Sequence, residues 1–270
     1  MAGSRAARAA LLPATLLALA GCSWATNYTD AAQPRFAGPV PDPATSPGWP
    51  DTLTVVSFNV EHGERLDAAL EALDAVERPD LVLLQEMDEE GAARIARALE
   101  MGWVYYPAIR NHRTGRHFGN AVLSRWPVIS DEKLVLPRLA AVGRSQRTAT
   151  VATVKVGPRE VRVYSAHLGT PVNLSLADRR AQMRTILQDA SRHPRVILGG
   201  DLNSGSMGEM AVERGYLWPT EEGPRTLLFG RWDHILYKGV GRPDEDAAGT
   251  LEDPADASDH RPVWARAIVR

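Results

Sequence analysis

The feature that most constrains the fold is a series of short apolar segments, each of which ends in a polar residue. In the first half of the domain, the apolar runs 53–60 (LTVVSFNV) and 81–86 (LVLLQE) alternate with segments of helical periodicity at about 64–77 and 90–100. Runs of this length indicate strands, and their alternation with helices is typical of α/β proteins. The sequence therefore predicts an α/β core.

The middle and the C-terminal part of the chain are richer in predicted strands. One further helix is predicted at about 175–192, and the remaining strand-like runs are 103–109, 121–124, 148–156, 161–169, 195–203, 232–238 and 261–269. Gly157-Pro158 separates two of these runs as a turn, and such hairpins pair their strands antiparallel. The sequence therefore predicts parallel and antiparallel pairing in one α/β (α+β) domain.

Polar side chains that can bind a metal or donate a hydrogen bond follow or precede these strands. They are Asn59, Glu86, His167, Asp201, Asn203, Asp233, Asp259 and His260. Each of them alone has a structural explanation, because Asn and Asp form turns, Glu86 can be a solvated helix entry and His167 a satisfied core histidine. Strand ends on one edge of a sheet converge, however, so the whole set predicts a functional site.

The donor atoms of this set narrow its chemistry. Asn59, Glu86, Asp201 and Asp259 offer oxygen, and the single cysteine of the chain excludes a cysteine-rich zinc cluster. Oxygen donors favour a hard ion, Mg²⁺ or Mn²⁺, over zinc. Together with two histidines, they are the groups needed for the attack of water on a phosphate ester.

Charge gives little indication of a nucleic-acid clamp. The 31 basic and 33 acidic residues leave a formal charge of −2, and no polycationic surface is expected. The densest basic run is 110–117 (RNHRTGRH), directly before Gly119-Asn120. Arg113, Arg116 and Asn120 are therefore candidates for binding substrate phosphates, although a solvated loop explains the run as well.

The N-terminal residues resemble the signal of a bacterial lipoprotein. Residues 1–10 carry two arginines and no acid, 11–20 are apolar, and Cys22 follows Leu19-Ala20-Gly21. We expect residues 1–21 to be a signal peptide, Cys22 to be lipidated, the Pro-rich segment 22–50 to be a tether, and 51–270 to be the folded domain. An apolar leader with an incidental cysteine is the alternative.

Seven motifs in order resemble the endonuclease/exonuclease/phosphatase superfamily. They are SFNVE (57–61), LQEMD (84–88), GNAVLSRWPV (119–128), SAHLG (165–169), GGDLNS (199–204), WDHIL (232–236) and SDHRPV (258–263). The resemblance covers about 52–269. It implies a four-layered α/β sandwich, in which two mixed β-sheets pack face to face with helices outside, and metal-dependent cleavage of phosphoester bonds.

The resemblance also implies a role for each residue of the predicted site. Asn59 and Glu86 correspond to metal-site residues, and Asp201 to the acid that orients or deprotonates the attacking water. Asn203 holds this water and the phosphate, and His167 donates to a phosphate oxygen. His260 stabilises the transition state or acts as base; Asp259 polarises it and also reaches a metal, and Asp233 orients it.

These observations predict a Mg²⁺-dependent (or Mn²⁺-dependent) hydrolase of phosphoester bonds, most simply a phosphodiesterase or nuclease. The alternatives are a phosphatase or sphingomyelinase-like phospholipase, and a non-catalytic binding lipoprotein. The expected location is the cell envelope, outside the cytoplasm, on the outer membrane if the organism has one. The expected partners are a phosphate-ester substrate and the membrane that holds the lipid anchor, and the chain is expected to be a monomer.

Overall fold

The computed structural model describes residues 24–39, 50–76, 78–228, 230–243, 247–251 and 256–269. The predicted signal peptide and Cys22 lie outside these residues. Within the described ranges, no helix is both long and apolar enough to cross a membrane.

Two mixed β-sheets form the centre of the molecule. The first has the order β1-β5-β6-β4-β3-β13-β12, with β2 also paired to β5, and the second has the order β11-β10-β9-β8-β7. Each sheet combines one parallel pair, β3 with β4 and β9 with β10, with antiparallel pairs. The strands are β1 (Ala25–Asn27), β2 (Phe36–Ala37), β3 (Thr52–Asn59), β4 (Leu81–Met87), β5 (Gly102–Asn111), β6 (His117–Ser124), β7 (Val128–Val135), β8 (Thr148–Val156), β9 (Arg159–His167), β10 (Val196–Asp201), β11 (Asp233–Lys238), β12 (Ala248–Thr250) and β13 (Val263–Ile268).

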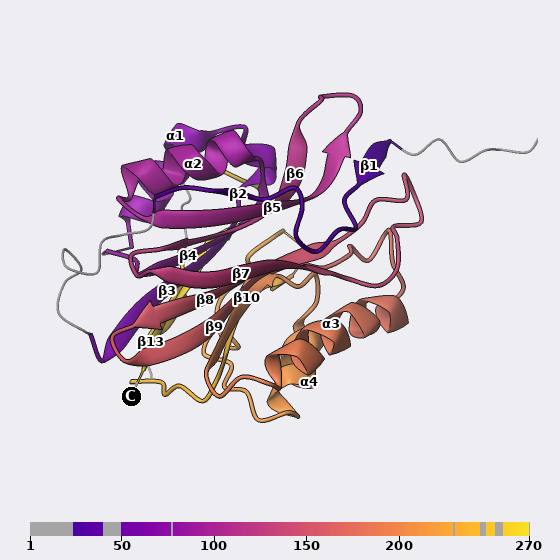
Figure 1. Cartoon of the computed structure of the whole chain (residues 1–270). Coiled ribbons are helices and arrows are strands. Elements are labelled where there is room, and N and C mark those ends of the chain that lie inside the picture. Colours follow the sequence, from indigo (N-terminus) through magenta and orange to yellow (C-terminus); the bar gives the residue numbers. More distant parts are fainter. Residues whose placement is uncertain are drawn as a thin grey trace, which may run out of the picture.

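Helices cover the outer face of each sheet, so that the domain has four layers (Figure 1). α1 (Leu66–Asp74) and α2 (Glu89–Ala98) lie on the first sheet, and α3 (Leu176–Ala190) and α4 (Gly205–Val212) lie on the second. A short 3-10 helix at Glu61–Gly63 follows β3. The α/β sandwich predicted from the sequence, with two mixed sheets face to face and helices outside, is confirmed.

The apolar runs form strands because both of their faces are buried. In β3, Val55 faces the core between the two sheets, whereas Val56 and Phe58 face the core under α1 and α2. Such strands read as continuous apolar runs rather than as an alternating pattern. α2 begins where the Asp88 side chain accepts a hydrogen bond from the Gly91 backbone N–H at 2.8 Å, as an N-cap does.

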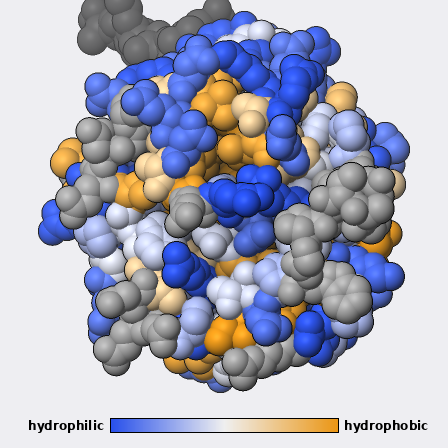
Figure 2. All heavy atoms as spheres, turned by 90° about the vertical axis from the view of Figure 1, so that its left-hand side faces the viewer, coloured by the Kyte–Doolittle hydropathy of each residue, from blue (hydrophilic) through white to orange (hydrophobic). Residues whose placement is uncertain are grey.

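The two ends of the sandwich differ. β3 runs toward the right-hand end of Figure 1, so that its last residue, Asn59, lies at this end. Figure 2 shows the opposite end, where hydrophilic residues surround apolar areas. The loops that follow the strands at the right-hand end therefore decide access to the predicted site.

Every predicted strand and helix is present, but several elements were missed. The sequence pattern did not indicate β1, β2, β7, β12 or α4. β7 is an edge strand with mostly half-buried or exposed residues and acidic and basic side chains, and edge strands of this kind lack a clear apolar pattern. α4 is short and contains two glycines, which weaken a helical pattern.

The structure differs from the predicted tether over 24–39. These residues contain β1 and β2, which both pair antiparallel with β5. Arg35 forms a bidentate ion pair with Asp131, with N···O distances of 2.6 and 2.7 Å. The buried Lys133 ammonium donates a hydrogen bond to the Gln33 carbonyl at 2.6 Å. Proline content indicated an extended chain, and the extended chain is here bound to the edge of the first sheet.

We therefore expect a chain that begins at Asp51 to be less stable than one that begins at Trp24. The shorter chain leaves Lys133 and Asp131 without Gln33 and Arg35, and unpaired buried groups are costly. We expect its melting temperature to be lower by about 5–10 °C, measured by circular dichroism. Equal melting temperatures would show that residues 24–50 add nothing to the stability of the domain.

Candidate functional site

Residues from five strands and from the loop before β13 meet at the right-hand end of the sandwich in Figure 1. From the first sheet come Asn59 at the end of β3, Glu86 near the end of β4, and His260 in the loop before β13. The second sheet brings Asp201 at the end of β10 and Asp233 at the start of β11, and its β9 ends with His167. The structure thus brings together six of the residues that the sequence predicted.

Asn59 joins the two sheets at this point. Its side-chain amide donates to Glu86 Oε1 at 3.2 Å and to Asp201 Oδ2 at 3.2 Å. Its own carbonyl oxygen accepts from the Glu61 backbone N–H at 3.2 Å. One buried amide therefore holds two carboxylates from different sheets side by side.

Glu86 and Asn203 both adopt a left-handed backbone conformation. Glu86 has φ of 56° and Asn203 has φ of 54°, values that are uncommon outside glycine and that cluster at functional sites. At Glu86, the pairing of β4 with β6 shifts register between Leu84 and Met87. This irregularity turns the Glu86 side chain toward Asn59 instead of leaving it on the regular alternation of the strand.

Gly199 and Gly200 explain how β10 brings Asp201 to the other residues. Gly200 has φ of 153°, and a Cβ there would collide with the carbonyl oxygen of Ala166 in β9. A Cβ on Gly199 would lie 2.6 Å from Leu83 Cδ1 of the first sheet. The two glycines therefore let β10 approach both its neighbouring strand and the opposite sheet directly before Asp201.

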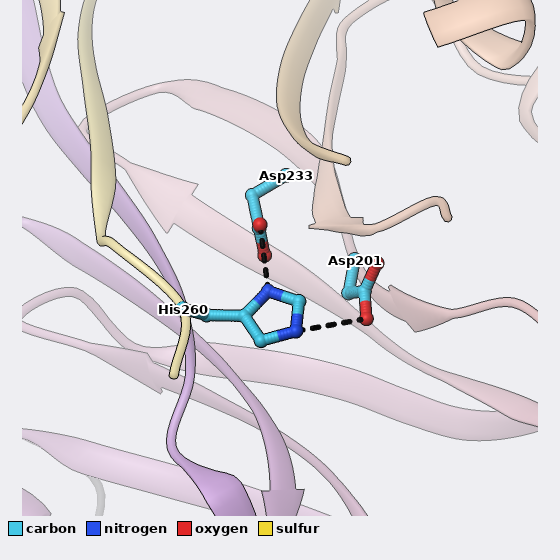
Figure 3. A group of neighbouring side chains, drawn as sticks. All are labelled: Asp201, Asp233 and His260. Carbon is cyan, nitrogen blue, oxygen red and sulfur yellow. Dashed lines mark hydrogen bonds and ion pairs between the residues drawn. The ribbon is translucent and has the colours of Figure 1, made fainter. Parts of the chain in front are cut away.

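Asp233, His260 and Asp201 form a line of interacting side chains (Figure 3). His260 Nδ1 lies 2.8 Å from Asp233 Oδ2, and His260 Nε2 lies 3.8 Å from Asp201 Oδ2. Thr226 Oγ1 accepts from the Asp233 backbone N–H at 3.2 Å. Asp233 thus fixes the orientation of the imidazole, whose other nitrogen points at Asp201.

Burial and neighbouring charges set the protonation of this line. Burial alone lowers the pKa of His260, but the carboxylates of Asp233 and Asp201 raise it to about 10. Burial and then the charge of Asp233 raise the pKa of Asp201 to about 7. At neutral pH the site therefore holds a cationic imidazole next to a carboxylate that can accept a proton.

Arg147 is a site residue that the sequence analysis missed. Its Nη1 lies 3.2 Å from His167 Nδ1, and its guanidinium lies 5.4 Å from the centre of the Phe118 ring. Burial lowers the pKa of His167 well below its ordinary value, and the positive charge of Arg147 lowers it further, so this histidine is neutral. His167 Nε2 lies 3.4 Å from Asp201 Oδ2.

The β8–β9 hairpin contains a signal that could have located Arg147. Val156 pairs with Arg159 across the Gly157-Pro158 turn. If this register continues away from the turn, residue 148 lies opposite His167. Arg147 is the next residue. His62 was also missed; its Nε2 lies 3.4 Å from Glu86 Oε2, and no strand pattern pointed to it.

The remaining predicted residues lie around this centre. Asp259 is exposed, with a side-chain accessibility of 57%, and its Oδ1 lies 3.9 Å from His260 Nε2. Asn203 donates from its side chain to the Leu168 carbonyl at 3.0 Å, and its backbone N–H donates to Asp201 Oδ1 at 2.9 Å. Asn203 also lines a hollow of about 360 Å³ together with Trp218, Arg231 and Trp232.

The three predicted phosphate ligands have different surroundings. Asn120 is buried between the sheets, where its amide donates to the Thr148 carbonyl at 2.7 Å. Arg116 is paired with Asp88 at 2.6 Å. Arg113 is exposed in the β5–β6 loop. The structure therefore groups none of them directly with Asp201 and His260.

The donor set fits a divalent cation. Asp201, Asp233 and His260 offer ligand atoms that lie within 4.8 Å of one another, but Asp233 and His260 already satisfy each other with a hydrogen bond. Glu86 and Asp201 instead present two carboxylates beside the Asn59 amide. Burial and the nearby carboxylates of Asp233 and Glu86 raise the pKa of Asp201, and a bound cation would stabilise its ionised form.

Comparison with known proteins places the sequence and the fold in the same group. A family model described as "Endonuclease/Exonuclease/phosphatase family" matches residues 56–260. No curated protein matches the sequence.

Solved structures share the fold at low sequence identity. An endonuclease/exonuclease/phosphatase from Beutenbergia cavernae has a TM-score of 0.66 at 20% identity, covering 81% of this chain and 72% of that chain. A family protein from Leptotrichia buccalis gives 0.63 at 16%, covering 80% and 99%. Sphingomyelinase C from Streptomyces griseocarneus gives 0.61 at 18%, covering 81% and 99%.

Proposed function

Because the chain belongs to the endonuclease/exonuclease/phosphatase family, we propose that this phosphoesterase is a Mg²⁺-dependent phosphodiesterase that acts outside the cytoplasm. The observation that carries the proposal is the line from Asp233 through His260 to Asp201, next to the Asn59 amide that joins Asp201 to Glu86. It combines a cationic donor, a proton acceptor and an oxygen-rich cation site within one buried centre.

Glu86 and Asp201 would hold the cation through their carboxylates, and Asn59 through its side-chain carbonyl oxygen. When bound, Mg²⁺ supplies Lewis-acid polarisation of the phosphate and neutralises developing charge. These residues match the hard, oxygen-preferring character of the ion, and Mn²⁺ fits the same donors.

The protein's own groups account for the proton transfer. Asp201 orients the attacking water and accepts its proton, because its carboxylate lies in the buried centre beside His260 and His167. His260 is cationic at that pH and donates to the oxyanion that develops on the phosphate, with Asp233 holding its ring in place. His167 is neutral and donates to a second phosphate oxygen, and Asn203 positions the water.

We also propose that Cys22 carries a lipid that anchors the enzyme in the cell envelope. The support is the sequence alone: an apolar stretch interrupted by Pro13 that is too short to span a bilayer, followed by the only cysteine of the chain. Metabolic labelling with a radioactive fatty acid tests this, because the label is expected on the wild-type chain and not on Cys22→Ala.

The proposed activity is tested with plasmid DNA, bis-p-nitrophenyl phosphate and sphingomyelin, each with Mg²⁺, with Mn²⁺ or with EDTA. We expect hydrolysis of at least one diester that EDTA abolishes and Mg²⁺ restores. Plasmid nicking would identify a nuclease. Hydrolysis of sphingomyelin but not of DNA would favour the second candidate, a lipid phosphodiesterase, for which the shared fold of the Streptomyces sphingomyelinase C is the supporting observation. Metal-independent hydrolysis, or none with any substrate, would contradict the proposal.

A further inference from the structure

An exposed surface that combines apolar and basic side chains lies beside the site. We call it the rim surface and define it by Trp24, Arg113, Val142, Arg144 and Val172. The three apolar residues are 66%, 54% and 89% exposed, in chain order. Soluble proteins rarely expose several large apolar side chains in one patch unless the patch binds a partner.

Contacts between four chain segments hold the rim surface together. β1 pairs Ala25 with Asn111, at the start of the loop that carries Arg113. The Trp24 ring lies against Gly143, between Val142 and Arg144. The Ala141 backbone N–H donates to the Asn173 carbonyl at 2.9 Å, next to Val172. In Figure 1, β1, the β5–β6 loop and the long β7–β8 connection lie at the same end of the molecule.

The rim surface adjoins the mouth of the site. The Gln146 backbone N–H donates to Asn27 Oδ1 at 2.7 Å, and the next residue, Arg147, contacts His167. On the other side, the Phe118 ring at the base of the β5–β6 loop lies 5.9 Å from the His167 ring. A partner bound to the rim surface would therefore face the catalytic residues.

The cations of the rim surface are not neutralised. Arg116 is paired with Asp88, and Arg138 with Asp178. In contrast, the described part of the chain contains no acid paired with Arg113 or Arg144. His112 adds a further titratable group, and together with Trp24 and Arg113 it lines a hollow of about 510 Å³.

We propose that the rim surface binds an anionic lipid bilayer and turns the mouth of the site toward it. A tryptophan ring prefers the level of the lipid head groups, and arginines near a bilayer are attracted to anionic lipids. Trp24 follows Cys22 by two residues, which span at most about 7 Å. A lipid on Cys22 would therefore hold this surface against the membrane, because β1 starts directly after Trp24.

The orientation has a consequence for the substrate. The site would meet phosphate esters exposed at a bilayer surface before those in solution, a consequence that rests on the proposed phosphodiesterase activity. Basic and aromatic residues also bind single-stranded nucleic acid. The exposed valines favour the bilayer, because they offer no stacking face to a base and contribute only apolar area.

Site-specific probes test the proposal in the full chain. Cys22→Ala removes the only thiol, so that Val142→Cys, Val172→Cys or Glu160→Cys can carry one environment-sensitive fluorophore. Glu160 is exposed next to the β8–β9 turn, at the other end of the domain, and serves as control. With vesicles of equal parts phosphatidylcholine and phosphatidylglycerol, we expect blue-shifted emission at 142 and 172 and none at 160, even if the leader also binds the vesicles.

Substitutions in the rim surface supply the second measurement. Adding Trp24→Ser and Arg144→Glu to the Val172→Cys chain is expected to raise the vesicle concentration for half-maximal shift by about tenfold, whereas the exposed control Lys155→Glu leaves it unchanged. Equal shifts at all three probes, or no shift at 142 and 172, would overturn the proposal. Probe shifts produced by single-stranded DNA and not by vesicles would overturn it in favour of a nucleic-acid surface. Hydrolysis of bis-p-nitrophenyl phosphate, measured on the same chains, tests the proposed function separately.

Discussion

Replacing Asp201 with asparagine is expected to lower kcat for bis-p-nitrophenyl phosphate by about 10³-fold or more. The substitution removes the proton acceptor and one carboxylate of the cation site. It also places an amide next to the Asn59 amide, which in the wild-type chain donates to the Asp201 carboxylate at 3.2 Å. Steady-state kinetics with saturating Mg²⁺ measures the effect, and a loss below about tenfold would contradict the role of Asp201 as base.

The same variant separates catalysis from folding. The pKa of Asp201 is about 7 in the folded chain, above its ordinary value of 3.8. Its ionised form therefore destabilises the fold, fully above pH 7 and progressively less as the pH falls toward 4. In EDTA, we expect the melting temperature of Asp201→Asn minus that of wild type to be larger at pH 8 than at pH 4.5. A variant that is less stable by the same amount at both pH values would indicate a structural defect.

Replacing Asp233 with asparagine is expected to move the alkaline limb of the pH–rate profile to lower pH. Burial lowers the pKa of His260, and Asp233 is the largest of the charges that raise it to about 10. Without that charge, only Asp201 and Asp259 oppose the effect of burial, so the pKa of His260 should fall toward its ordinary 6.5. Because the proposed mechanism needs the protonated imidazole, wild-type activity should persist up to about pH 10, whereas activity of the variant should decline above about pH 6.5.

At pH 8, a His260 pKa near 6.5 leaves about one imidazole in thirty protonated, so kcat is expected to fall by about 30-fold. kcat and kcat/KM are measured from pH 5 to pH 10.5. The matched control is Asp189→Asn, which alters another buried carboxylate that accepts a hydrogen bond from the Tyr164 hydroxyl at 2.7 Å on the α3 side of the second sheet. An alkaline limb that stays in place in Asp233→Asn would show that His260 is not the group that titrates.

Much of the site could be predicted because it lies at the ends of regular strands. Apolar runs in the sequence mark the strands. Polar residues at their ends, such as Asn59, His167 and Asp201, could therefore be identified as site candidates from their position. The two glycines before Asp201 have a structural reason, because β10 contacts both β9 and the opposite sheet at these positions and leaves no room for a Cβ atom. Asp233 and His260 were also found because they flank predicted strands, and the resemblance of WDHIL and SDHRPV to the family motifs supplied their roles.

Arg147 and the N-terminal segment were missed for different reasons. Arg147 is one arginine among many, and its place beside His167 depends on the register of the β8–β9 hairpin. Residues 24–39 carry too little apolar periodicity to predict strands, and β1 and β2 form because the edge of β5 offers them unpaired backbone groups.

The sequence by itself determined the α/β class, most strand positions and the identity of the oxygen and imidazole groups at their ends, because local apolar patterns and strand termini are properties of contiguous residues. Only the tertiary structure decided how these groups interact. It paired Asp233 with His260, made Asn59 the bridge between Glu86 and Asp201, and buried Asp201 until its pKa rose to about 7. Those properties depend on the distance between two sheets and on the exclusion of water, which no stretch of sequence contains.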